Sequence, residues 1–314
     1  MKFYIIRRLI NLLIIMFIVG VITFIIIRVI PGDPAAVMAG PWASDEAVQD
    51  IRESLGLDRP ILVQFFEWIW DVLHGDFGES VYQGEKVTKL IGISWPISIY
   101  LTLGSFIIAI GLGVPLGIIS AVRKGTLVDS IIRVILVIGV SIPSFWLGLN
   151  LIYIFSVKLN WFSSGGYVPL NVSILENLRS MLLPCISLGF IQSALISRMT
   201  RSSLLDVMRQ DYITAAEAKG LKQRVVIYKH ALRNASIPII TIIGMSLGLL
   251  LGGSIIIETV FALPGLGWLS VSAIQYRDFS LVQGVLVFYA FLISFFNMLV
   301  DISYAFLDPR IKYS

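Results

Sequence analysis

Long apolar runs dominate this sequence and leave few folds open to it. A helix of about 20 apolar residues crosses the roughly 30 Å hydrocarbon core of a bilayer. Only 14% of the residues are charged, against about 25% in soluble domains. A helix also satisfies its own backbone hydrogen bonds in lipid, so the sequence predicts an all-α integral membrane protein with six transmembrane helices. The apolar runs cover residues 9–27, 97–122, 134–157, 181–196, 237–257 and 281–307.

The first run follows three basic residues, Lys2, Arg7 and Arg8. A secretory signal peptide begins in the same way, but its apolar core is usually about 7–15 residues long. The run 9–27 is longer, so we expect a retained first helix. Arg28 would lie at its outer end and extend its side chain to the interface, and the sequence Pro31-Gly32-Asp33-Pro34 is expected to end the helix.

The charged residues between the runs predict the orientation. Residues 31–95 hold eleven acidic and four basic residues, whereas residues 198–233 hold eight basic and three acidic ones. Loops rich in Lys and Arg remain in the cytoplasm. We therefore expect both termini and the segment 198–236 to be cytoplasmic, and the loop 31–94 to lie outside.

The outer loop contains its own helix signals. Ser44, followed by two acidic residues, is a typical helix start. Val48, Ile51 and Leu55 give that helix an apolar face, and Gly56 is expected to end it. Two tryptophans further on are expected at the lipid interface; they are Trp68 and Trp70. The loop is either a lid packed on its own membrane domain or a surface that receives another protein.

A polar, basic segment, residues 211–238, separates two of the apolar runs. Ile213, Ala216 and Gly220 recur at helical spacing, and a glycine just past the last periodic residue commonly ends a helix. The next piece, residues 221–232, mixes basic and apolar residues and is expected to form a second, amphipathic helix. The segment either fixes the membrane orientation by its charge or forms a binding surface for a soluble partner protein.

The wording of this segment resembles the permease subunits of ABC importers. Their cytoplasmic signature is matched by Ala215-Ala216, three further residues and Gly220. The sequence departs from it at two positions: Thr214 replaces the usual Glu, and Arg233 replaces the Pro of most members. Here the Pro comes later, at Pro238. Ala-Lys-Gly-Leu followed by His-Ala-Leu-Arg-Asn-Ala is similar to the dipeptide/oligopeptide branch. The resemblance implies that this is the coupling helix that docks on an ATPase subunit. The implied docking residues are Asp211, Tyr212, Ala215, Ala216, Glu217, Ala218, Lys219 and Gly220.

The stretch from Gly252 to Gly267 also resembles the peptide permeases. It places an ionisable Glu258 at the outer end of a helix, followed by an aromatic residue and a Pro-Gly turn. Such a turn at membrane depth requires surrounding protein or a water-filled cavity. We expect an outer gate here; the alternative is a plain interfacial turn with a solvated Glu258. The gate residues would be Gly252, Gly253, Glu258, Phe261, Pro264 and Gly265.

Small and polar residues inside the runs indicate helix packing. Glycines at every fourth position share one helix face and permit close approach, either within the subunit or against a second permease; they are Gly244, Gly248 and Gly252. Asp301 is an acid inside an apolar helix, with Asn297 one turn earlier. It is read as a structural anchor, with substrate contact as the alternative. Pro115 and Pro143 are expected to kink their helices.

Several chemistries are excluded by missing motifs. The sequence has no phosphate-binding Gly-x-x-x-x-Gly-Lys-[Ser/Thr] loop and no His-Glu-x-x-His pair, so no ATPase or metalloprotease is indicated. The histidines are His74 and His230, both outside the apolar runs, so an intramembrane Ser–His protease lacks a base. Cys185 is single, which excludes a disulfide within the chain and a cysteine metal cluster. No cofactor or metal is predicted on this chain.

The resemblance covers essentially the whole chain, including the ending Leu-Val-Asp and Leu307-Asp308-Pro309-Arg310. It implies a type I ABC importer transmembrane domain over residues 95–307, after an N-terminal helix (1–30) and an outer loop (31–94), with a short tail (308–314). The implied partners are a second permease, two ATPase subunits that carry ATP and Mg, and an external substrate-binding protein, in a prokaryotic plasma membrane; no nucleic acid is involved.

Two questions remain open at this level. A self-sufficient secondary transporter or channel would require inverted repeats or several midplane charges, and the sequence shows no internal repeat. Within the importer family, the substrate would be a dipeptide, an oligopeptide, glutathione or a nickel complex. The runs contain no cluster of metal-binding side chains, which favours peptides.

Overall fold

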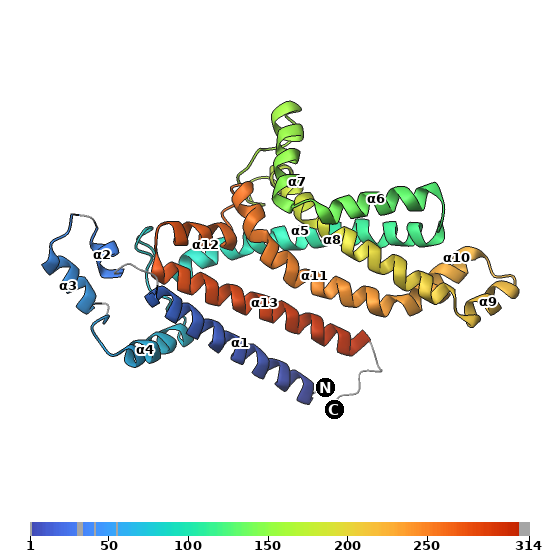
Figure 1. The fold of residues 1–314 in the computed structure, drawn as a ribbon. Coiled ribbons are helices and arrows are strands. Elements are labelled where there is room, and N and C mark those ends of the chain that lie inside the picture. The colour runs from blue at the N-terminus through green and yellow to red at the C-terminus, as the bar shows by residue number, and fades with distance from the viewer. Residues whose placement is uncertain (1, 30–33, 41, 55, 308–314) are drawn as a thin grey trace. The chain divides into compact units, whose positions relative to one another are not determined.

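The computed structural model describes residues 2–29, 34–40, 42–54 and 56–307, and the regular elements in those ranges are helices (Figure 1). Three sequence expectations fall outside them: the helix stop at residues 31–33, Leu55 and the tail 308–314. The elements are α1 (Lys2–Val29), α2 (Pro34–Ala39), α3 (Asp45–Ser54), α4 (Ile61–Leu73), α5 (Val87–Val122), α6 (Leu127–Ser141), α7 (Ser144–Leu151), η1 (Ile152–Lys158), α8 (Ile174–Met208), α9 (Asp211–Ala218), α10 (Gln223–Val225), η2 (Val226–Ala231), α11 (Leu232–Val260), α12 (Leu266–Gln275) and α13 (Phe279–Leu307).

The predicted membrane-spanning fold is confirmed. Among the described residues, five helices are long and apolar enough to cross a bilayer, and there are six spans if one bent pair is counted as a single span. The bent pair is the third predicted helix, in which α6 and the α7–η1 helix meet at 104°. Ile142 is extended, with φ −88° and ψ 128°, because a residue before proline is driven out of the helical region. Pro143 therefore breaks this helix, whereas Pro115 lies inside the uninterrupted α5.

The chain folds as two compact units. The first comprises Met1–Ile5, Ser98–Pro264 and Phe296–Ser314, and the second comprises Ile6–Ile97 and Gly265–Phe295. Helix α8 lies at the centre of the first unit, where it packs against α6, α7 and α11. About two thirds of its apolar stretch is buried (67%). It extends beyond the apolar run 181–196 at both ends because short polar side chains, mostly serines, complete its buried face.

Glycines bring α5 and α8 into close contact in the first unit. A Cβ at Gly117 would lie 2.6 Å from the carbonyl oxygen of Ser197, and one at Gly189 would lie 2.5 Å from the carbonyl oxygen of Ser105. Real Cβ atoms do not approach backbone atoms so closely, so only glycine fits at either position. The two backbones therefore touch here, as small residues permit in membrane proteins.

The predicted glycine face of α11 is less uniform. Gly244 is buried, and a Cβ at Gly248 would lie 2.9 Å from the Oδ1 atom of Asn297 on α13. Gly252, by contrast, is exposed, with nothing within 4 Å of its Cβ position. Asp301, one turn beyond Asn297, is half-buried.

In the second unit, α1 packs against α4 of the outer loop. The Phe24 ring lies 5.0 Å from the Phe65 ring and 5.8 Å from the Trp68 ring. Arg28 donates from Nη2 to Oε1 of Gln64 at 2.7 Å. Trp68 is therefore covered by α1, while Trp70 stays 65% exposed. The C-terminal half of α1 is thus packed against α4.

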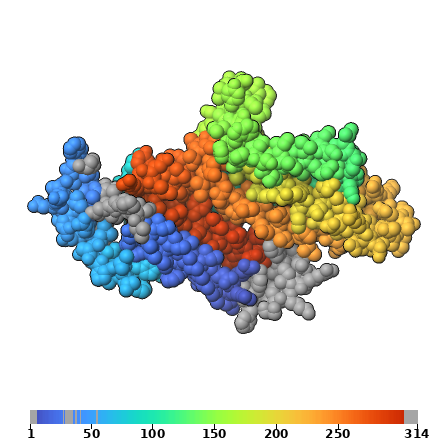
Figure 2. Space-filling model, in the orientation of Figure 1, coloured from blue at the N-terminus to red at the C-terminus, as the bar shows by residue number. Residues whose placement is uncertain are grey.

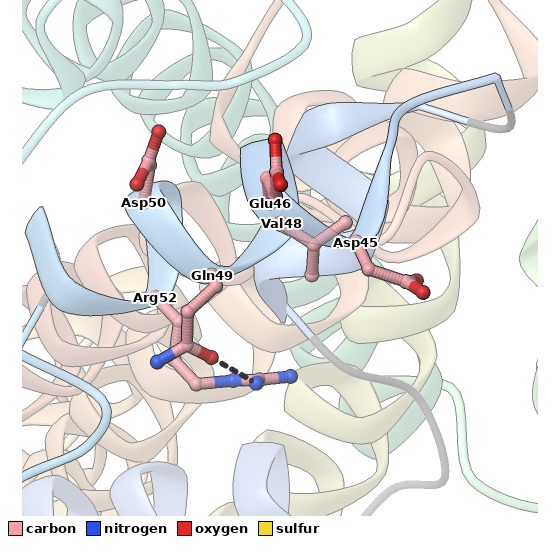
Figure 3. A pocket seen from close by; sticks show the side chains of 6 residues that line it. All are labelled: Asp45, Glu46, Val48, Gln49, Asp50 and Arg52. Carbon is pink, nitrogen blue, oxygen red and sulfur yellow. Dashed lines mark hydrogen bonds between the residues drawn. The ribbon is translucent and has the colours of Figure 1, made fainter.

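Helix α3 begins as predicted. The Ser44 hydroxyl accepts a hydrogen bond from the Ala47 amide at 3.3 Å, which is an N-cap. Val48 and Ile51 of its predicted apolar face are half-buried. On the surface of the helix, Arg52 donates to Gln49 at 2.8 Å, while the carboxylates of Glu46 and Asp50 point away from that pair (Figure 3).

A buried carboxylate organises the start of α13. Asp278 is 1% exposed and accepts from the Leu281 amide at 3.1 Å, the position of a helix N-cap. It also accepts from the Ser80 hydroxyl at 2.5 Å and from the Tyr82 amide at 3.1 Å. The Tyr82 ring stacks on Tyr276 with centroids 3.6 Å apart. The outer-loop turn at residues 80–82 is thereby fixed to the α12–α13 corner.

Candidate functional site

Helix α9 has two unlike faces. Ile213 and Ala216 are buried, at 1% and 8% exposure, in a cluster to which α5, α8 and η2 contribute Ile118, Leu204 and Val226. The remaining residues of the predicted docking set point outward and are exposed. They are Asp211, Tyr212, Ala215, Glu217, Ala218, Lys219 and Gly220.

The end of α9 is fixed by its backbone. Gly220 has φ +76°, its amide donates to the carbonyl of Glu217 at 2.8 Å, and the Leu221 amide donates to the carbonyl of Ala216 at 3.4 Å. This pair of bonds is a Schellman motif, with the left-handed residue immediately after the C-cap. Glycine is required because other residues pay a steric penalty at positive φ. The helix therefore turns back sharply at Gly220, as the sequence predicts.

The predicted separate helix over residues 221–232 is wrong. The chain is helical from Gln223 through α10, η2 and α11 to Val260. The basic residues thus form the first turns of a long span. Charge composition suggested a boundary, but no glycine lies between Leu221 and Pro238, and Pro238 itself lies within the helix.

Helix α9 is attached to two membrane helices. It follows α8 after two residues, and the Asn234 side-chain amide of α11 donates to the Tyr212 hydroxyl at 2.7 Å. Its buried face also packs against α5. Helix α9 is therefore in contact with three long helices, α5, α8 and α11.

A buried ion pair that sequence reasoning missed lies at the same end of the first unit. Asp129 on α6 is 1% exposed, and Arg201 on α8 binds both its oxygens at 3.0 Å. Ser120 on α5 donates to it at 2.6 Å, and the Gly125 amide donates at 3.1 Å. The four groups clamp α5, α6 and α8 together. The sequence feature that could have indicated this pair is Asp129, a single acidic residue just before an apolar run. Its partner, Arg201, is 72 residues away in the sequence.

Two residues of the predicted outer gate, Glu258 and Phe261, are buried in the first unit. Glu258 is 0% exposed, and the Ser98 hydroxyl donates to its Oε1 atom at 2.7 Å. The alternative of a solvated Glu258 is therefore wrong. Its carbonyl accepts from the Leu263 amide at 2.8 Å, and Ala262 adopts φ +49°, so α11 ends in the same kind of turn as α9.

Phe261 is 1% exposed and lies against glycines of α7 and of the segment between η1 and α8. Its carbonyl accepts from the Gly166 amide at 2.9 Å, and its ring lies 3.0 Å from the Cβ position of Gly148 on α7. Elsewhere in the stretch, a Cβ at Gly253 would lie 3.0 Å from Leu188, while Gly252 faces open space. The last two predicted gate residues flank the start of α12, with Pro264 half-buried and Gly265 at the N-cap.

The described residues hold no group of three or more His, Cys, Asp or Glu side chains arranged to bind a metal ion. Cys185 is buried in α8. In the first unit the structure brings polar groups together at two helix-linking sites, Asp129 and Glu258, and on the surface of α9. Their arrangement suits mechanical linkage between helices.

Comparison with known proteins covers nearly the whole sequence. The family described as "Binding-protein-dependent transport system inner membrane component" matches residues 113–313, and the family of its N-terminal part matches residues 1–102. A putative peptide transport system permease protein of Brucella abortus (strain 2308) is 43% identical over 98% of both chains. A probable D,D-dipeptide transport system permease protein of Escherichia coli (strain K12) is 40% identical over 93% of this chain and 92% of its own.

A glutathione transport system permease protein of Escherichia coli (strain K12) is 38% identical over 99% of both chains. Among solved structures, an inward-facing form of the MetNI methionine ABC transporter matches with a TM-score of 0.57. That match has 21% identity and covers 70% of this chain and 96% of the other, so it shows a shared fold.

Proposed function

We propose a substrate class from the family to which this chain belongs, the binding-protein-dependent transport system inner membrane components, which are the non-catalytic permease subunits of ABC importers. The proposed substrates are di- or oligopeptides or glutathione-like solutes. The substrate class rests on the relatives, whose names give peptides, D,D-dipeptides and glutathione as cargo. Membership of the family implies ATPase and binding-protein partners. The partners we propose in addition are a second, homologous permease that completes the pathway and two ATPase subunits that carry ATP and Mg.

The two-faced helix α9 carries the coupling part of this proposal. Its buried face is fixed to α5 and η2 by Ile213 and Ala216, while its outer face is free to dock. ATPase closure would displace α9 as a rigid piece. The Asn234–Tyr212 bond would pass that displacement to α11 and the direct connection would pass it to α8. The Asp129 clamp would make α5 and α6 follow α8.

At the other end of α11, the buried turn at Glu258 and Phe261 is the proposed outer gate. Tilting α11 would strain the Ser98–Glu258 bond and the contact between Phe261 and Gly166. Opening of the pathway on the outer side would then require the Ser98–Glu258 and Gly166–Phe261 hydrogen bonds to break. Because the basic segment 198–236 favours the cytoplasmic side, we propose that both termini lie in the cytoplasm and the loop 31–94 lies outside.

We expect Ala215→Arg to abolish recovery of ATPase subunits when the protein is purified in mild detergent. Ala215 is exposed on the outer face of α9, so an arginine there blocks docking without disturbing the core. Ala216 is a poorer probe because it is buried. The measurement is co-purification followed by an ATPase assay of the recovered complex.

The matched control is Leu127→Arg, which places the same charge at an exposed position (82%) at the start of α6. It should leave recovery unchanged. Loss of ATPase subunits in both variants, or in neither, would contradict docking on α9. Uptake by proteoliposomes without ATP would contradict the importer function itself.

We expect Gly220→Leu to uncouple ATP hydrolysis from uptake while insertion in the membrane stays normal. A residue with a side chain at φ +76° destabilises that backbone conformation by about 1–2 kcal/mol. Relaxation of this strain would change the direction in which the chain leaves α9. Uptake of a labelled dipeptide and ATPase rate are measured together. Gly84→Leu imposes similar strain, at φ +64° with nothing within 4 Å, in the outer loop. Equal uptake by the two variants would refute a special role for the α9 turn.

A further inference from the structure

A groove of about 770 Å³ lies between α6 and α8 in the first unit, within the roughly 300–1,000 Å³ of small-ligand pockets. The two helices run side by side (Figure 1), and Figure 2 shows α6 in green on the surface beside α8 in yellow. The groove is apart from the docking face of α9 and from the gate stretch. Its lining residues are Ser130, Arg133, Val134, Leu136, Val137, Ile138, Val140, Ser141, Ala194, Arg198, Arg201 and Ser202.

The groove is basic at one end and aliphatic at the other. Antiparallel helices bring Arg133 of α6 to the same end as Arg198 and Arg201 of α8, an end fixed by the Arg201–Asp129 pair. Arg201 is committed to Asp129. Arg133 pairs with Asp129 through Nε at 3.5 Å and donates from Nη2 to the Ser130 hydroxyl at 3.2 Å, yet its side chain stays 53% exposed. Arg198 is exposed and has no hydrogen bond or ion pair with any residue that the structure describes. The guanidinium of Arg198 and the exposed part of the Arg133 guanidinium can thus contact an anion.

The length of the aliphatic wall fits one leaflet of a bilayer. From Ser130 to Ser141 the wall covers eleven helical steps, about 16 Å at 1.5 Å per residue. That is about half of the roughly 30 Å hydrocarbon core. The basic end is on the side that the charge distribution assigns to the cytoplasm, where anionic headgroups attract Lys and Arg.

The composition of the wall favours a lipid over a protein helix. Helices that pack against one another in membranes present small residues that permit close approach. The exposed wall of α6 instead presents branched aliphatic side chains, including Val134, Val137 and Ile138 at 49–66% exposure. Flexible acyl chains fill such an uneven surface readily, and a guanidinium binds a phosphate through two parallel hydrogen bonds.

We propose that this groove is a binding site for an anionic phospholipid, with the headgroup phosphate on Arg133 and Arg198 and an acyl chain along α6. Because the site joins α6 to α8 next to the Asp129 clamp, an occupied groove would hold those two helices together.

Native mass spectrometry of the protein, purified with the subunits that accompany it, tests the proposal. Phosphatidylglycerol and phosphatidylethanolamine of equal chain length serve as probes. We expect preferential retention of phosphatidylglycerol. Since each basic residue near an anionic surface is worth roughly a fivefold gain, Arg198→Gln should lower retention about fivefold and the double variant with Arg133→Gln about thirtyfold. Arg123→Gln, an exposed arginine outside the groove, is the matched control and should retain the lipid as the unaltered protein does.

Unchanged retention in Arg198→Gln, a variant that loses no contact within the described chain, would overturn the proposal. Val137→Trp fills the aliphatic part and should lower lipid retention while both arginines remain. If Val137→Trp has no effect and inorganic phosphate displaces the lipid completely, the site binds anions alone and the proposal fails. It fails also if a photo-crosslinker at Val137→Cys captures a protein subunit instead of a lipid.

Discussion

Replacing Asp129 by alanine should lower the free energy of unfolding by about 3 kcal/mol. Removal of one member of a buried ion pair costs roughly 3–5 kcal/mol because the other charge loses its compensation. Arg201 keeps 22% of its side chain exposed, which places the expected loss at the lower end. Ser120 and the Gly125 amide also lose their acceptor. The measurement is thermal unfolding of the purified protein, together with the yield of monodisperse material.

Two comparisons isolate the cause of that loss. Changing Asp129 and Arg201 both to Leu leaves no unpaired charge, so we expect this double variant to be more stable than Asp129→Ala. Glu176→Gln removes an exposed pair, Glu176–Arg179 at 3.1 Å with half-exposed partners, and should cost less than about 1 kcal/mol. If Glu176→Gln and Asp129→Ala have the same effect, the Asp129 cluster is not a clamp.

Gly117→Val is expected to cost about 3 kcal/mol or more. Its Cβ would lie 2.6 Å from the carbonyl oxygen of Ser197 and 2.6 Å from the Cβ of Thr200. Overpacking of a well-packed core typically costs about 1–3 kcal/mol. Here the obstacle includes backbone, which cannot change rotamer, so α5 and α8 must separate. Thermal unfolding in detergent again gives the measurement.

Gly111→Val is the matched control, because it makes the same change on the same helix. Gly111 is exposed and has nothing within 4 Å of its Cβ position. We expect no loss of stability there, since valine has the better helix propensity. A loss as large as that of Gly117→Val would mean that α5 tolerates no added side chain, and the α5–α8 contact would then not explain the effect.

The features that could be predicted from the sequence are those that depend on local chain chemistry. The helical spans follow from apolar length, because a backbone in lipid must bond to itself. The end of α9 follows from Gly220, since the left-handed turn there excludes a side chain. The N-cap at Ser44 and the break at Pro143 are local in the same sense. The separate helix over 221–232 failed because charge composition alone does not end a helix.

Which faces of the helices meet was decided only by the tertiary structure. A helix that is apolar all round has no periodic stripe that marks its buried side. The sequence therefore indicated the glycines of α11, where Gly252 is open, and missed the α5 glycine Gly117, whose backbone touches α8. The same reason hid the partners of Asp129 and the burial of Glu258. Arg201 and Ser98 are 72 and 160 residues from these carboxylates, and only packing brings such distant groups together.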